Sequence, residues 1–137
     1  MAEYRIFVSH GSQDLWLAAQ IAKELHALGA TTFLDETSIP KGSPSFRDVI
    51  RHEISISSEM VVVFTPWSSM RSWVWIEMGA AWMRRIPILA VFYGLSVSDL
   101  DKSGQGKAIL EDINVVSLNE LGTYLSQLQV RIQEARS

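Results

Sequence analysis

A run of six residues in the middle of the chain, Met60–Thr65, is apolar up to its last position. A strand with one face in water alternates apolar and polar side chains, because successive side chains point to opposite faces. Met60–Thr65 shows no such alternation, so both of its faces are expected to be buried. Strands of this kind are typical of the centre of a parallel sheet that is covered by helices. The run therefore predicts an α/β protein.

The rest of the chain supplies the other elements of such a sheet. Residues 94–112 are too polar to assign to an element. Strands that alternate with helices predict a flavodoxin-like α/β fold, a doubly wound parallel sheet of five strands in the order 2-1-3-4-5 with helices on both faces. Apolar stretches predict strands at Arg5–Val8, Thr31–Leu34, Pro87–Phe92 and Ile113–Val116. Helical periodicity predicts three helices: one with Leu17, Ile21, Leu25 and Leu28, one over Phe46–Ile56, and one with Leu121, Leu125, Leu128 and Ile132.

The composition limits the classes of protein to consider. The 137 residues, 47% hydrophobic and 20% charged, fit a single domain over residues 1–137. The net charge of −3, without clustered Lys and Arg, argues against nucleic-acid binding. The absence of cysteine excludes disulfides, thiolate nucleophiles and cysteine-bound metals. No secretion signal or membrane-length apolar stretch is found, so we expect a cytoplasmic protein that does not contact a membrane.

One charged residue, Glu77, interrupts an uncharged and strongly apolar stretch, Ser72–Met83. This stretch is expected to form the helix that follows the central strand. Moving a carboxylate out of water is costly, so a buried carboxylate normally has a partner or a chemical use. Glu77 is therefore the first candidate for a catalytic residue.

The expected topology indicates where a site would lie. In an open parallel sheet, ligands bind outside the carboxyl ends of the strands, where the strand order reverses. For the order 2-1-3-4-5 this crevice lies between strands one and three, beside the loops Ser9–Asp14 and Pro66–Ser72. Glu77 lies about one and a half turns into the next helix, and helical side chains lean towards the N-terminus, so its carboxylate should reach the crevice. Trp73 is expected on the same helix face.

Several common occupants of this fold do not fit the loops. A phosphoacceptor receiver domain needs acidic residues at the ends of strands one and three, where this chain has Ser9-His10 and Thr65-Pro66. The sequence contains neither the glycine pattern of a P-loop nor that of a dinucleotide-binding turn. It also lacks the spacing of a metal site and a Gly-x-Ser-x-Gly elbow, so we expect no metal and no resident cofactor.

Three parts of the chain resemble the boxes of the Toll/interleukin-1 receptor (TIR) domain, particularly of its stand-alone bacterial kind. Ile6–His10 resembles the first-strand box, and Phe33–Glu36 with Ile39–Gly42 resembles the second strand and the BB loop after it. Ser72–Glu77 resembles the helix that carries the catalytic glutamate in NAD-cleaving members. The likeness extends over essentially the whole chain. His10 departs from the family pattern, which often has an aromatic residue or an arginine there.

The resemblance implies an NAD+ glycohydrolase or cyclase, which cleaves the nicotinamide–ribose bond to give nicotinamide and ADP-ribose or a cyclic isomer. It assigns catalysis to Glu77, with NAD+ as substrate. It also implies self-association through the loop Asp35–Pro44, a part in bacterial defence against phage, and an effector protein that senses a cyclic nucleotide product. The residues expected to contact the substrate are Ser9, His10, Ser12, Asp35, Ser69 and Trp73.

Each candidate also has a plain structural interpretation. Glu77 can pair with Arg71 or Arg84, or reach solvent at the edge of its helix. The remaining candidates divide between helix caps, turns, local hydrogen bonds and the core: Ser12, Asp14, Ser69 and Ser72 as caps, Asp35 in a turn, His10 in a local hydrogen bond and Trp73 in the core.

Two other functions stay open beside the one that the resemblance implies. A non-enzymatic TIR-like adaptor would recruit other TIR domains through its BB loop and would have no need of a carboxylate at Glu77. A nucleoside deoxyribosyltransferase also uses a single glutamate, but acts on nucleosides. Replacing Glu77 separates the adaptor from the enzymes, and comparing NAD+ with nucleosides as substrates separates the two enzymes.

Overall fold

The chain forms a sheet of parallel strands. The computed structural model describes residues 3–34, 46–103 and 107–137. Its five-stranded sheet has the order β2-β1-β3-β4-β5, with every neighbouring pair parallel. The predicted flavodoxin-like fold is confirmed, and the strand order reverses between β1 and β3. The strands are β1 (Arg5–Ser9), β2 (Thr31–Phe33), β3 (Glu59–Phe64), β4 (Ile88–Phe92) and β5 (Asn114–Ser117).

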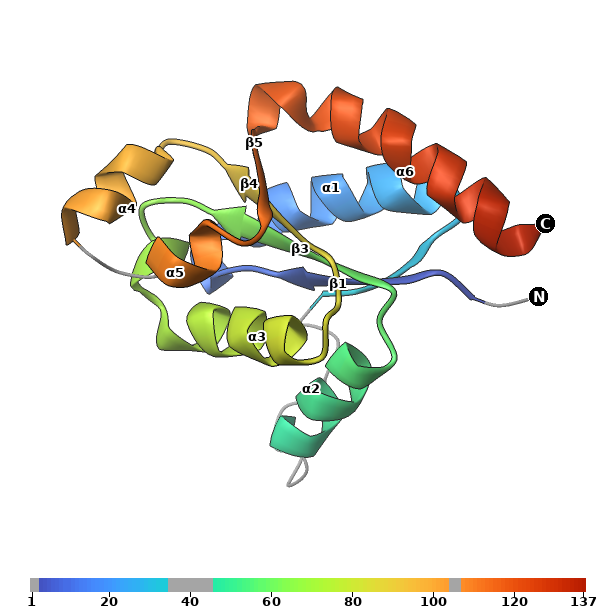
Figure 1. The fold of residues 1–137 in the computed structure, drawn as a ribbon, viewed down its shortest axis with the longest axis horizontal. Coiled ribbons are helices and arrows are strands. Elements are labelled where there is room, and N and C mark those ends of the chain that lie inside the picture. Colours follow the sequence, from blue (N-terminus) through green and yellow to red (C-terminus); the bar gives the residue numbers. More distant parts are fainter. Residues whose placement is uncertain (1–2, 35–45, 104–106) are drawn as a thin grey trace.

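Helices cover both faces of the sheet (Figure 1). Helices α1 (Leu15–Ala27) and α6 (Leu121–Arg136) lie on one face, and α2 (Phe46–Ser55) and α3 (Ser72–Met83) lie on the other. The shorter α4 (Val97–Ser103) and α5 (Lys107–Leu110) add to the face of α2 and α3. Short 3-10 turns lie ahead of three of the helices: η1 (Ser12–Asp14), η3 (Ser68–Met70) and η4 (Leu118–Glu120).

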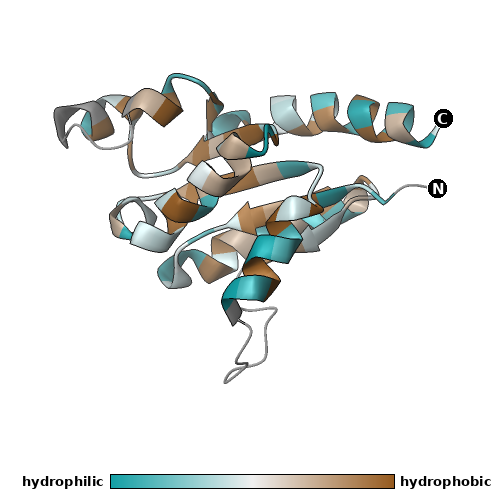
Figure 2. Ribbon diagram, turned by 60° about the horizontal axis from the view of Figure 1, so that its bottom comes forward, coloured by the Kyte–Doolittle hydropathy of each residue, from teal (hydrophilic) through white to brown (hydrophobic). Residues whose placement is uncertain are grey.

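The side chains of the central strand are shared between two cores. Met60, Val62 and Phe64 pack with the layer of α2 and α3, whereas Val61 and Val63 pack with the layer of α1 and α6. All six residues of β3 are buried. Figure 2 shows α2 and α6 banded in brown and teal, as expected for helices with one face on a core. The missing alternation in Met60–Thr65 therefore reflects burial of both faces, as predicted.

The boundaries and one region differ from the sequence prediction. Strand β4 begins at Ile88, because Pro87 has no N–H for the ladder; its carbonyl still accepts a 2.9 Å hydrogen bond from the Met60 N–H. The unassigned stretch 94–112 contains α4 and α5, which are anchored in the core by Leu100 and Leu110. These helices are too short to show a clear period in the sequence.

Candidate active site

Glu77 lies beside the end of the first strand, where it is hydrogen-bonded to Ser9. The Ser9 hydroxyl donates to Glu77 Oε1 over 2.6 Å. Ser9 is the last residue of β1, and Glu77 is the sixth of α3. Ser9 is 0% exposed and Glu77 is 1% exposed, so the pair is screened from solvent. The structure therefore brings two of the predicted site residues together at the carboxyl edge of the sheet.

The burial of Glu77 follows from its place on the inner face of α3. The buried residues of this helix are Val74, Glu77, Met78 and Ala81, a spacing that places them on one helical face. The carboxylate thus replaces an apolar residue in the stripe that packs on the sheet. Charge interactions in such surroundings are screened far less than in water. The interpretation in which Glu77 reaches solvent at a helix edge is wrong.

A buried hydrogen-bond network links the β1–α1 loop to the β3–α3 loop. Asp14 is 6% exposed, and its Oδ2 accepts a 2.6 Å hydrogen bond from the Thr65 hydroxyl. The Thr65 N–H donates to Ser68 Oγ over 2.8 Å, and Ser68 Oγ donates to the carbonyl of Val63 over 2.7 Å. Asp14 was expected to serve the start of α1, but its side chain makes no cap hydrogen bond there. Neither Thr65 nor Ser68 is among the predicted site residues, although Thr65 follows the apolar strand and Ser68 lies in the loop predicted to flank the crevice.

Arg71 joins the same two loops nearer the surface. Its Nη1 donates to the Ser12 hydroxyl over 3.0 Å. Ser12 does not cap the first helix, because Gly11 is the N-cap of η1 and the Ser12 side chain contacts Arg71 instead. A Cβ at Gly11 would lie 3.2 Å from Arg71 Cδ and 3.4 Å from Ser68 Cα. Glycine thus permits the close approach of the two loops.

His10 and Ser69 have local partners. His10 is buried, and its Nδ1 lies 3.2 Å from the carbonyl oxygen of Val8, in agreement with the local interpretation. Ser69 is also buried, and its hydroxyl donates to the carbonyl of Pro66 over 3.3 Å. Neither Ser69 nor Ser72 caps α3, because the N-cap of that helix is Arg71 and no side-chain cap hydrogen bond forms.

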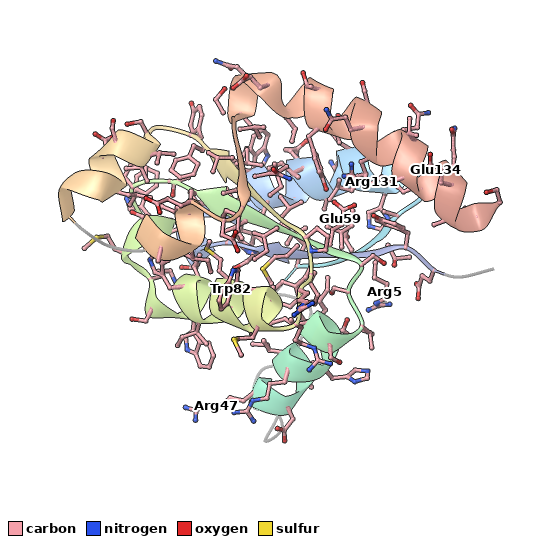
Figure 3. The ribbon with its side chains drawn as sticks, in the orientation of Figure 1. Arg5, Arg47, Glu59, Trp82, Arg131 and Glu134 are labelled. Atoms are coloured by element: carbon pink, nitrogen blue, oxygen red, sulfur yellow. The ribbon has the colours of Figure 1, made fainter. Side chains whose placement is uncertain are left out.

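Trp73 of α3 is half-buried and lies close to α2. The Arg47 guanidinium of α2 lies 5.9 Å from the centroid of the Trp73 ring, and Figure 3 shows Arg47 at the lower end of α2. The neighbouring Trp75 donates from Nε1 to the carbonyl of Ser69 over 2.8 Å. The predicted site residue Asp35 and the loop Asp35–Pro44 lie outside the described residues. Substrate contacts by any of these residues stay predictions.

A further buried carboxylate, Glu59, lies at the amino end of β3, opposite the Glu77 edge. It accepts hydrogen bonds from the hydroxyls of Tyr4 and Tyr124, the second over 2.9 Å, and from Arg131 Nε over 2.8 Å. Figure 3 shows Glu59 and Arg131 beside each other under α6. Burial and the nearby Glu59 raise the pKa of Tyr4 to about 12 and raise the pKa of Tyr124 as well. Because two hydroxyls and a guanidinium compensate Glu59, it has a structural role.

Two cavities of the described structure lie along β4 and β5. One, of about 780 Å³, is lined by the end of α3, the start of β4 and the segment before β5. Another, of about 440 Å³, lies between Glu59, β5 and α6. Neither is lined by Ser9 or Glu77.

The fold and the site define a doubly wound α/β protein with a buried carboxylate at its topological switch point. The family model of the TIR domain matches residues 6–129. The chain therefore belongs to the TIR domain family. No curated protein sequence matches it.

Solved structures share this fold. The TIR domains of the activated Roq1 resistosome, which directly recognizes the pathogen effector XopQ, match with a TM-score of 0.67 and 17% identity, over 98% of this chain and 100% of theirs. A 2-deoxyribosyltransferase from the psychrotolerant bacterium Bacillus psychrosaccharolyticus matches with a TM-score of 0.55 and 14% identity, over 71% of this chain and 80% of that one. At such identities the likeness shows a common fold.

Membrane and metal features were sought in the described part of the chain. None of its helices has the length and apolar character needed to cross a bilayer. Within the same residues, no group of three or more His, Asp or Glu side chains is placed to hold a metal ion.

Proposed function

We propose that this TIR domain cleaves the nicotinamide–ribose bond of NAD+, as a glycohydrolase or a cyclase, with Glu77 as the catalytic residue. The observation that carries the proposal is the Glu77 carboxylate itself, buried at the switch point and hydrogen-bonded to Ser9. Membership of a family that includes NAD-cleaving enzymes supports it. No cofactor is required, since NAD+ is the substrate.

One carboxylate suffices for this reaction. The nicotinamide of NAD+ is a pyridinium, so it takes the electron pair of the breaking C–N bond and leaves as a neutral molecule. No acid has to protonate it, in contrast to ordinary glycoside hydrolysis with its two carboxylates. Positive charge develops on the ribose, and a carboxylate in water-poor surroundings stabilises that charge strongly. Capture by water gives ADP-ribose, and capture by a group of the same molecule gives a cyclic isomer.

The closed site suits an enzyme that becomes active on rearrangement. NAD+ has to reach a carboxylate that is 1% exposed. We expect the opening to accompany self-association, for which the predicted contact is the loop Asp35–Pro44. The same proposal places the activity in the bacterial cytoplasm, in defence against phage, with an effector protein that senses a cyclic product.

The test is to incubate the purified protein with NAD+ over a range of protein concentrations and resolve the products. We expect nicotinamide release by the wild type and a loss of at least about 100-fold in Glu77→Gln and Glu77→Ala. Glu77→Gln preserves the volume of the side chain and an acceptor for the Ser9 hydroxyl, so the fold should persist. Glu134→Gln, at an exposed glutamate of α6, is the matched control and should retain full activity.

Two outcomes would redirect the assignment. If the folded wild type releases no nicotinamide at high concentration under conditions that promote assembly, the enzyme proposal is wrong and an adaptor that binds other TIR domains takes its place. If nucleosides are cleaved and NAD+ is not, the protein acts like the deoxyribosyltransferase that shares its fold. Both substrates should therefore be tested on the same preparation.

A further inference from the structure

Ser9 occupies a rigid position in the sheet. It ends β1, which lies between β2 and β3, and it is paired with Val62 of β3. The residue is completely buried. Because the pairing of β1 with β3 extends to Ser9, the backbone at this position is fixed by the sheet, and its hydroxyl has a well-defined place relative to α3.

The Ser9 hydroxyl has a single proton, and it uses this proton to donate a hydrogen bond of 2.6 Å to Glu77 Oε1. An ionised carboxylate only accepts hydrogen bonds, so Ser9 is the donor of the pair. While Ser9 makes this bond it has no proton to donate to a substrate, and the binding measurement below tests whether its oxygen accepts a hydrogen bond from one. We infer that Ser9 is a positioning residue, which orients the Glu77 carboxylate towards the reacting ribose, instead of the substrate contact predicted from the sequence. This inference rests on the proposed NAD+ cleavage.

A neutral donor suits this task. At the opposite edge of the sheet, Arg131 contacts both oxygens of Glu59, over 2.8 and 3.0 Å, and adds a positive charge that offsets the carboxylate. A serine hydroxyl orients its acceptor without adding a charge. The hydrogen bond from Ser9 therefore leaves unchanged the negative charge of Glu77, which would stabilise a cationic ribose.

Orientation matters because a glutamate side chain has several rotatable bonds. Its neighbours on the buried face of α3, Val74, Met78 and Ala81, offer packing but no side-chain hydrogen-bond donor. Holding Oε1 at Ser9 also sets the direction of the second carboxylate oxygen. Misplacement of a reacting group by about 1 Å can cost about 100-fold in rate.

The experiment compares Ser9→Ala with wild type and with Ser57→Ala. Ser57, which lies just before β3, is the matched control. Its hydroxyl also donates a 2.6 Å hydrogen bond, in this case to the carbonyl of Glu53 in α2. In Ser9→Ala we expect a fall of about 10- to 100-fold in kcat with KM within about twofold. The acid limb of the kcat/KM profile should move to higher pH, because a hydrogen bond to a carboxylate favours its ionised form. The nearby titratable side chains His10, Asp14 and Arg71 are the same in both proteins. Ser57→Ala should show neither change.

A binding measurement separates positioning from substrate contact. In the Glu77→Gln background, NAD+ affinity can be measured by calorimetry without turnover. Adding Ser9→Ala should leave that affinity within about twofold, whereas a lost substrate hydrogen bond would weaken it by up to about tenfold. If Ser9→Ala fails to fold, Ser9→Cys takes its place: its thiol is a weaker donor than a hydroxyl, so kcat should still fall while NAD+ affinity stays within about twofold.

The outcomes distinguish this inference from the proposed function. A Ser9→Ala enzyme with kcat within twofold of wild type, or a clear loss of NAD+ affinity in the double variant, overturns the positioning role while NAD+ cleavage by the wild type stands. Absence of any NAD+ cleavage by the wild type overturns the proposed function and the role of Ser9 with it.

Discussion

At the scale of single residues, the buried carboxylates have different surroundings. Glu59 is compensated by two tyrosine hydroxyls and a guanidinium. Asp14 receives the hydroxyl of Thr65, and Glu77 receives that of Ser9. The Arg131 guanidinium adds a positive charge beside Glu59, whereas the Ser9 hydroxyl adds none beside Glu77, in keeping with the proposed catalytic role.

Replacing Thr65 by valine should destabilise the protein. The substitution preserves the shape of the side chain but removes the hydroxyl that donates to Asp14 over 2.6 Å. A buried acceptor that loses its donor costs about 1–3 kcal/mol. We expect a decrease of that size in the free energy of unfolding, measured by urea denaturation at neutral pH.

Thr32→Val is the control for this prediction. Thr32 is also a strand residue, but its hydroxyl lies 2.9 Å from His26 Nε2 in an exposed pair. Such a substitution should change the free energy of unfolding by less than about 0.5 kcal/mol. Equal effects of Thr65→Val and Thr32→Val would show that the buried network of Asp14 contributes nothing.

The sequence predicts the participants of the site better than their contacts. Glu77 stands out because it is the one charge in an apolar helix, and the topology places it near the end of β1. The bond between Thr65 and Asp14 joins residues 51 positions apart, and no local pattern indicates it. In the sequence, helix capping was a sufficient explanation for Ser12 and Asp14. Only the packing of the two loops shows their tertiary partners, Arg71 and Thr65.

At the scale of elements, a strong apolar pattern was sufficient to predict a strand or helix from the sequence, whereas a weak pattern was not. The five strands and the four longer helices occur where apolar patterns predict them. Helices α4 and α5 were not predicted, because each contributes one buried leucine, Leu100 or Leu110, to the core. With Val97 and Ile109 partly buried beside them, these helices of 7 and 4 residues are still too short to show a period, and they depend on tertiary contacts.

The middle of α3 offers a stabilising substitution. Gly79 lies inside this helix, and a Cβ built there meets no atom within 4 Å. Alanine is favoured over glycine in a helix interior by about 0.5–1 kcal/mol. Gly79→Ala should therefore raise the free energy of unfolding by that amount, as a shift of the urea midpoint to higher concentration.

Gly29, just after α1, should respond in the opposite direction. Its φ of 97° lies in the region that favours glycine, and an added Cβ would be 2.5 Å from Arg136 Nη1. Gly29→Ala should lower the midpoint, because the backbone is strained and Arg136 must move. A midpoint raised by both substitutions would contradict the assigned helix end.

At the scale of the whole molecule, the two edges of the sheet have different tasks. The carboxyl edge holds Ser9, Glu77 and the two linked loops. At the amino edge, Glu59 joins Tyr4, just before β1, to Tyr124 and Arg131 of α6. This cluster attaches the C-terminal helix to the central strand, on the side away from the candidate active site.

The amino-edge cluster should make stability fall in alkali. Burial and the hydrogen bond to Glu59 raise the pKa of Tyr4 from 10.0 to about 12. The folded protein therefore keeps a proton that the unfolded chain loses above its ordinary tyrosine pKa. By linkage, this contribution to stability is complete below pH 10 and is lost as the pH rises to about 12.

Urea denaturation at several pH values between 9 and about 12 measures this effect when wild type is compared with Tyr4→Phe. Other groups that titrate in this range are common to both proteins, so the difference between the two curves reports Tyr4. We expect the free energy of unfolding to fall more steeply with pH in the wild type, because phenylalanine has no proton to lose. Parallel curves would mean that Tyr4 titrates alike in the folded and unfolded chain, and would remove it from the cluster that attaches α6 to the sheet.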